Sequence, residues 1–490
     1  MANARFDNLY AVKKVDLQPM QTSQTVRVNV RGEVDKILAC SVQSIATTCE
    51  CLQGEGVVNG RTNVKILYLD QTGDVCSANC NADFANTVQG EIVPNAQMQA
   101  FVTVLETKSS AFGNVITVEV VFELACTVYV GQQETVFVDG DLFVKRDDKQ
   151  IATKVDCHTV CGEIEQQLQT AHAIQRVLLA DSVVSVSDFS LSQGVATVQG
   201  KAMVELTYFS QKLCHQTFTF DFSQEFVASS LSETAQNAVW VDVKNTKIKL
   251  DIVEDEQNDL FTAEIVLCLN VLQTHVENVS VILDAYDKGC DLAFARHALT
   301  TVLPCGNARV DKKVSAVLPQ QIQGEVVCAS NKHVVVSSVQ SADGGVNLQG
   351  LVCFDLLTIC DEGYVTTPVQ MPFDERLEVD FVAADCVVGV EGCVKSVAVA
   401  IAGELKVDAQ LQFNVVAQLL SCVDVIVNVE EIALQRDDRY AIEISIANKG
   451  DTLWDLAKNL RMSQEEVLAV NPEISSPLQE PTKIVAYNKL

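Results

Sequence analysis

The chain has 490 residues, of which 48% are hydrophobic and 20% charged, and its formal net charge is −29. Several domains are expected, because single hydrophobic cores stop growing beyond roughly 250–300 residues. So acidic a surface repels phosphate backbones and argues against nucleic-acid binding; solubility is its simplest role. The sequence has no run of eighteen apolar residues, so we expect no membrane span.

The first residues, MANARFDNLYAVKK, lack the apolar segment and small-residue cleavage site of a secretory signal. We therefore expect a cytoplasmic protein. Its eighteen cysteines are many for that compartment, but most lie in apolar runs, where a thiol acts as a small hydrophobic group. The nearest approach to a metal cluster is Cys157-His158-x-x-Cys161, whose spacing is not that of a zinc site. We expect ordinary thiols there, and no metal or cofactor.

One thirteen-residue pattern occurs three times, at 58–70, 198–210 and 348–360. Each copy has a glycine after an apolar–polar pair, then an alternating run, and a phenylalanine follows about 22 to 24 residues later. The glycines are Gly60, Gly200 and Gly350, and the phenylalanines are Phe84, Phe222 and Phe373. A G-E-V or G-E-I pattern also occurs at 32–34, 162–164 and 324–326. Repeats at this spacing are domain-sized and predict three homologous domains.

We place these domains at residues 1–134, 135–279 and 280–430, with a smaller unit at 440–490. In the first domain, turn signals separate alternating runs at 25–34, 37–46, 56–70, 74–84, 98–107 and 115–130, and residues 1–20 lead in. Comparable runs follow in the other two domains. Short strands rich in β-branched residues predict a mainly β protein built from three antiparallel β-sandwich-like repeats.

Four segments are harder to assign. Residues 163–180 fit a helix or a strand, and we favour a strand because the matching segment of the first domain is one. Residues 284–299 and 430–439 are expected to be linkers, the former with at most a short helical turn. The acidic run 254–259 is expected to be a solvated hairpin tip, since its spacing does not fit a calcium loop.

Catalytic motifs are missing from the sequence. Its six histidines are scattered, and neither H-E-x-x-H nor a phosphate-binding G-x-x-x-x-G-K-[ST] loop occurs. The carboxylates that recur at matched positions are Glu33, Glu163 and Glu325 of the G-E pattern. A shared structural hydrogen bond explains them better than three active sites would. We expect a protein that is not an enzyme.

The last fifty residues predict a βααβ module. A strand is expected at 440–446, and then a helix capped by Asp451 or Thr452 with apolar residues on one face. Ser463 and Glu466 form a capping box for a second helix that stops before Asn471-Pro472, and residues 483–487 close the module as a strand.

The motif G-D-T-L-W-D-L-A-K, with N-P-x-I before the last strand, resembles a LysM domain. The resemblance implies a shallow groove that binds N-acetylglucosamine glycans such as peptidoglycan, between the first strand–helix loop and the second helix–strand loop. The matching residues are Gly450, Asp451, Thr452, Leu453, Asn471, Pro472 and Ile474. Turn formation, helix capping and core packing would also explain them, so a sugar-binding role stays open.

The three repeats, in turn, resemble SPOCS domains, which occur in tandem with a C-terminal LysM domain in SipL-like sporulation proteins. The resemblance implies a non-catalytic adaptor of spore-coat and envelope assembly in the mother-cell cytoplasm, at the forespore surface. Its LysM domain would bind a SpoIVA-like coat morphogenetic ATPase. Two alternatives remain: a peptidoglycan-binding protein, and a structural spore-layer protein that assembles with itself.

Overall fold

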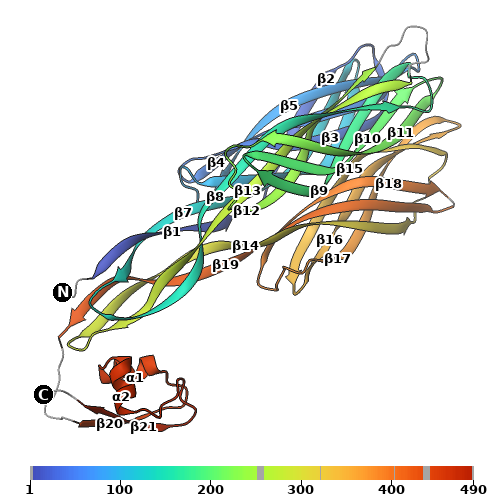
Figure 1. Cartoon of the computed structure of the whole chain (residues 1–490). Helices are drawn as coiled ribbons and strands as arrows, with labels where there is room; N and C mark the ends of the chain where they lie inside the picture. Colours follow the sequence, from blue (N-terminus) through green and yellow to red (C-terminus); the bar gives the residue numbers. More distant parts are fainter. Residues whose placement is uncertain (1–3, 251–258, 321, 402, 434–441, 488–490) are drawn as a thin grey trace.

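The computed structural model describes residues 4–250, 259–320, 322–401, 403–433 and 442–487. Within them the chain is almost entirely antiparallel β-structure, and two short helices lie near the C-terminus (Figure 1). The expected mainly β fold with a small C-terminal βααβ module is confirmed. Three units of similar strand order precede that module, each around its own hydrophobic core.

The first unit consists of two sheets. Its strands are β1 (Arg5–Asp16), β2 (Met20–Asn29), β3 (Val34–Cys51), β4 (Glu55–Asp70), β5 (Val75–Gln89), β6 (Gln97–Phe112) and β7 (Val115–Asp139). One sheet has the order β3-β4-β5. In the other, β7 pairs with β1 and β2 along successive parts of one edge, and with β6 along the opposite edge. The core lies between the two sheets.

The second and third units repeat this arrangement. The second contains β8 (Phe143–Gln169), β9 (Arg176–Ser192), β10 (Val195–Phe209), β11 (Leu213–Val227), β12 (Gln236–Leu250) and β13 (Leu260–Tyr286). The third contains β14 (Asp291–Leu318), β15 (Glu325–Ala342), β16 (Gly345–Cys360), β17 (Gly363–Glu378), β18 (Val387–Ile401) and β19 (Leu405–Ile432). The proposed domain limits at residues 134 and 279 lie inside the strands β7 and β13. The three domain limits stay our proposal.

The recurring glycine and phenylalanine are cross-strand partners. Each glycine lies in the central strand of a three-stranded sheet and pairs in register with its phenylalanine: Gly60 with Phe84, Gly200 with Phe222, and Gly350 with Phe373. The phenyl ring lies over the glycine. A Cβ on Gly350 would be 2.6 Å from the Phe373 ring and 2.4 Å from the Val335 carbonyl oxygen. Since both partners belong to one hairpin, the hairpin length sets their separation in sequence.

The G-E pattern, by contrast, does not mark equivalent positions. Gly32 and Gly324 have φ values of +77° and +100° in the turns before β3 and β15. Gly162 lies inside β8 and pairs with Leu267, so Glu163 is a mid-strand residue, unlike Glu33 and Glu325. The expectation of one shared hydrogen-bonding role for the three glutamates is therefore wrong. The match at 162–164 is therefore a chance similarity in sequence and not an equivalent structural position.

Two sequence expectations about connecting segments are also wrong. Strand β1 occupies most of the supposed lead-in, and residues 284–299 belong to β13 and β14, joined by a four-residue turn at 287–290. The preference for a strand over 163–180 is confirmed at both ends, where β8 runs to Gln169 and β9 begins at Arg176. Most of the acidic run 254–259, and most of the linker 430–439, lie outside the described residues.

The long strands extend beyond the sandwiches as three two-stranded ribbons: β1 with the end of β7, the start of β8 with the end of β13, and the start of β14 with the end of β19. We call this three-ribbon bundle the stalk (Figure 1). Its shared core takes apolar residues from all three ribbons: Leu9, Ala11, Val136, Ile151, Val281, Leu299, Val423 and Val425. The three units therefore form one body.

Polar contacts also link the three-stranded sheets of neighbouring units. Lys65 of the first unit donates to Asp181 of the second, with 2.7 Å between Nζ and Oδ1. Lys332 of the third unit pairs with Glu205 of the second, and both side chains are largely buried. The Val42 amide of the first unit donates to the Asn331 side chain of the third. Each unit thus contacts both others.

The glycine–phenylalanine pairs lead to a first prediction. Gly350→Ala places a methyl group against Val335 and Phe373, and we expect it to lower the free energy of unfolding by about 1–3 kcal/mol through overpacking. Gly389→Ala in β18 is the matched control, because a Cβ there meets no atom within 4 Å and φ is not positive. That substitution should be neutral or stabilise by up to about 1 kcal/mol. Denaturant titration measures both, and equal effects would contradict the packing argument.

A second prediction concerns two carboxyl groups from different units. Burial raises the pKa of Asp242 in β12 to about 6, although Asn270 donates a hydrogen bond to it. Burial and the Asp242 carboxylate raise the pKa of Glu391 in β18 to about 8. Raised carboxyl pKa values mean that the folded chain holds protons which the unfolded chain releases. Their contribution is fully present below about pH 4, the unfolded-state pKa, and falls as pH rises, until about pH 6 for Asp242 and about pH 8 for Glu391.

Thermal midpoints between about pH 5 and about pH 9 test this prediction. The midpoint should fall up to about pH 8 and level off above it, and Glu391→Gln should flatten the fall because the glutamine carries no proton to release. A Glu362→Gln substitution in the turn before β17 removes an exposed carboxylate and should leave the slope unchanged. The same slope in all three proteins would exclude the buried pair as its source.

Candidate functional site

The C-terminal module consists of β20 (Ile442–Ala447), α1 (Leu453–Leu460), α2 (Gln464–Val470) and β21 (Thr482–Tyr487), with β20 antiparallel to β21. Its small core contains Trp454, Leu456, Ala457, Leu460, Val467 and Ile484. Helix α1 has eight residues and α2 has seven, which is too few for a stable isolated helix. Packing on this core therefore stabilises both helices.

Both helices begin with the expected caps. Thr452 is the N-cap of α1 and forms a reciprocal capping box with Asp455, whereas Asp451 lies one residue earlier. The hydrogen bond from the Thr452 hydroxyl lowers the pKa of Asp455. Ser463 and Glu466 form the second capping box, and α2 ends at Val470, before Asn471-Pro472. These local predictions from the sequence are confirmed.

Backbone hydrogen bonds join the first candidate loop to the segment before β21. Gly450 has φ +98° at the turn after β20, and its amide donates to the Leu478 carbonyl at 2.9 Å. The Leu478 amide donates to the Asp451 carbonyl at 3.0 Å, and the Leu453 amide donates to the Ser476 hydroxyl at 2.9 Å. Sequence reasoning did not include Ser476 and Leu478, although the Ser-Ser-Pro turn there was a signal for them.

The second candidate loop begins at Asn471, whose side chain holds α2 against β21. Its amide group donates to the carbonyls of Val467 and Val485 at 3.0 and 2.8 Å, and its side-chain oxygen accepts from the Val485 amide at 2.8 Å. Pro472 is exposed, while Leu453 and Ile474 are half-buried and pack against the same module core. Whether these residues bind a ligand stays a prediction.

The module rests on the end of the stalk. We define the stalk tip as Phe143, Asp284, Tyr286, Lys288 and Asp291, which come from β8, β13, β14 and the turn between the last two. Tyr286 is 4% exposed, and its hydroxyl donates to the Met462 carbonyl at 2.8 Å. Asp284 accepts from the Trp454 indole nitrogen at 2.9 Å and from Lys458. We call these interactions the docking contact.

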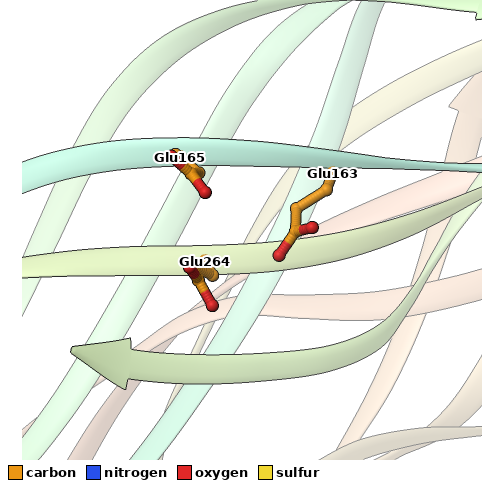
Figure 2. A group of neighbouring side chains, drawn as sticks. All are labelled: Glu163, Glu165 and Glu264. Carbon is orange, nitrogen blue, oxygen red and sulfur yellow. The ribbon is translucent and has the colours of Figure 1, made fainter.

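A separate acidic cluster lies on the second unit. Glu163 and Glu165 of β8 and Glu264 of β13 place carboxylate oxygens within 4.8 Å of one another (Figure 2). Carboxylates at this spacing suit a hard divalent cation. Glu264 is the buried member, and the ammonium group of Lys249 on β12 pairs with it. Lys249 therefore already supplies the compensating charge, and the two exposed glutamates need no ion.

The cysteine–histidine pattern in β8 does not converge. Cys157 and Cys161 are four residues apart on an extended strand, a separation of about 13 Å, which is too far for one ion. Cys161 instead lies opposite Cys268 of β13. Within the described residues, no helix is long and apolar enough to cross a membrane.

Comparison with protein families identifies two regions. The family described as SipL, SPOCS domain matches residues 33–110, which cover β3 to β5 and most of β6. The LysM domain family matches residues 447–479, from the end of β20 to the loop before β21. No curated protein and no solved structure matches the chain. The expected resemblance to SipL-like proteins with a C-terminal LysM domain is thus confirmed.

These matches point to a sporulation protein that carries a domain of a peptidoglycan-binding type. Both are non-catalytic domain families, which agrees with the absence of catalytic motifs from the sequence. From here on the C-terminal module is called the LysM domain.

A third prediction separates a structural role of Asn471 from a ligand-binding role. Asn471→Ala removes three hydrogen bonds, and we expect it to destabilise the LysM domain by about 1–3 kcal/mol. Hydrogen exchange of the α1 and β21 amides in the full chain measures this, with the sandwich amides as internal reference. Asn459→Ala, at an exposed position of α1, should change little. Unchanged exchange in Asn471→Ala would instead leave its side chain free for a ligand.

Proposed function

We propose that this protein is a non-catalytic adaptor in spore-coat and envelope assembly, and that its LysM domain binds a SpoIVA-like coat morphogenetic ATPase. In this proposal the protein works in the mother-cell cytoplasm at the forespore surface. The contact residues would come from the seven loop positions Gly450, Asp451, Thr452, Leu453, Asn471, Pro472 and Ile474.

The observation that supports a protein partner is that the polar side chains of these loops already form hydrogen bonds within the domain. Asp451 accepts from the Asn448 amide, Thr452 is bound to Asp455, and Asn471 is fully engaged between α2 and β21. A sugar presents many hydroxyl groups, and binding loses free energy when they lack partners. What the loops still offer is apolar surface at Leu453, Pro472 and Ile474, together with backbone carbonyl groups, since the amides of residues 450–453 already donate within the domain.

Apolar patches with a polar rim are typical of the central part of protein–protein interfaces. A partner of this kind would also avoid breaking the capping bonds that hold the loops. Binding of a peptidoglycan glycan is the second candidate, because the LysM family match favours it. It would have to rely mainly on backbone carbonyl groups of these loops, because the amides of residues 450–453 already have acceptors.

Two aspartate substitutions in the full-length chain provide the test. Leu453→Asp places a charge in the apolar loop surface, at the first position of α1, where an acidic residue suits the helix. We expect it to reduce capture of the purified coat ATPase at least about tenfold, as loss of an interface anchor does. Leu468→Asp is the control, since Leu468 is 39% exposed on α2 and lies outside the loops.

Sedimentation with purified peptidoglycan runs in parallel with the same three proteins. Retention of the ATPase but not of glycan, with loss in Leu453→Asp alone, would support the adaptor proposal. Retention of glycan alone would overturn it in favour of wall binding.

A further inference from the structure

The docking contact between the LysM domain and the stalk tip is a built interface. Tyr286 stacks on Phe143 with ring centroids 4.9 Å apart, and it meets the Trp454 ring edge-on at 5.0 Å. Asp284 receives the indole N–H at 2.9 Å and the Lys458 ammonium at 2.7 Å from each carboxylate oxygen. Partly buried polar groups from both sides are therefore paired with each other.

Opposite charges line the same interface. Lys288 in the turn after β13 lies 2.5 Å from Glu466 of α2, and Asp291 of β14 pairs with Arg461 after α1. With Asp284 and Lys458, three acid–base pairs cross between the two parts. Most of these side chains are half-exposed, so each pair contributes little and is weakened by salt. The interface is thus specific but of modest strength.

The covalent connection makes a modest interface sufficient. Strand β19 ends at Ile432 and β20 begins at Ile442, so nine residues connect the stalk to the LysM domain. Two parts separated by so few residues of one chain have an effective concentration for each other on the order of millimolar. An interface of only millimolar intrinsic affinity would then be closed about half of the time, and a tighter one more often.

We propose that the stalk tip is a binding site for the LysM domain, and that the docking contact is a reversible, charge-dependent latch. In the closed state the tip covers Trp454, the last turn of α1 and the start of α2. A ligand that needs this helical side must open the latch, whereas one that needs only the loops at 450–453 and 471–474 need not. The latch does not depend on which ligand the loops bind.

The chain supplies its own probe for this proposal, because Trp240 and Trp454 are its two tryptophans. Trp240→Phe leaves Trp454 as the only tryptophan, which can be excited selectively over the tyrosines, and it lies beside Tyr286 and Asp284. Acrylamide quenching of Trp454 should be weak in this background at low salt. It should rise severalfold, with emission shifted to longer wavelength, as sodium chloride approaches ~1 M, where the screening length falls to ~3 Å.

Charge reversal provides an independent arm in the same background. Asp291→Arg should increase quenching of Trp454 at low salt, because it places two positive charges together. The double variant Asp291→Arg with Arg461→Asp should return quenching to the weak level of the background, because the two residues attract each other again with their charges exchanged. Asp221→Arg, a change of the same charge at an 83% exposed side chain of the second unit, is the control and should have no effect.

Strong quenching of Trp454 at low salt in the unaltered background would overturn the proposal, because the domain would then be undocked in solution. Quenching that is weak but insensitive to both salt and charge reversal would overturn the charge-dependent latch as well. The salt titration uses no stalk variant, so its outcome does not depend on the folding of Asp291→Arg.

Discussion

The architecture depends on one constraint: a two-stranded ribbon cannot bury its own apolar face. A lone hairpin is marginally stable in water, because both of its faces stay exposed. The long strands of each unit leave their sandwich as such a ribbon, yet the inner positions of these ribbons are apolar, as at Ile151 and Val281. Packing the three ribbons against one another removes these faces from water and joins the units into one body.

The three-stranded sheets of the three units also pack against one another, and this limits which surfaces are free for self-association. The fifth residue after each recurring glycine is charged: Lys65, Glu205 and Asp355. Lys65 and Glu205 each pair with the neighbouring unit, while burial raises the pKa of Asp355, which lies beside Asn331. Because these sheet surfaces are occupied inside the chain, a second copy cannot use them. Assembly of copies would need other surfaces.

Local features could be predicted from the sequence, and long-range ones could not. The capping boxes at Thr452 and Ser463 depend on residues three positions apart, and the glycine–phenylalanine pairs lie within single hairpins. The docking contact joins Asp284 to Trp454, which are 170 residues apart, so no local pattern marked the segment after Asp284 as more than a linker. Strand β1 was missed for the same reason, since its partner lies at the far end of β7. In the candidate loops the sequence identified the residues but not their contacts. Whether the Asn471 side chain faces a ligand or Val485 depends on the packing of α2 against β21.

The cysteines bear on the alternative of a structural spore-layer protein that assembles with itself, because disulfides between copies could cross-link such a layer. Thiol oxidation and exchange proceed through the thiolate, so a raised pKa makes a cysteine slow to react. Burial raises the pKa of Cys49, Cys157, Cys328 and Cys393 to about 12, and other buried thiols shift the same way. Cys161 and Cys422 are exposed, on the second unit and on the stalk respectively. Six of the other cysteines are buried and ten are half-buried. Dense cross-linking through many thiols is therefore disfavoured, and a cross-linking role would use Cys161 and Cys422 first.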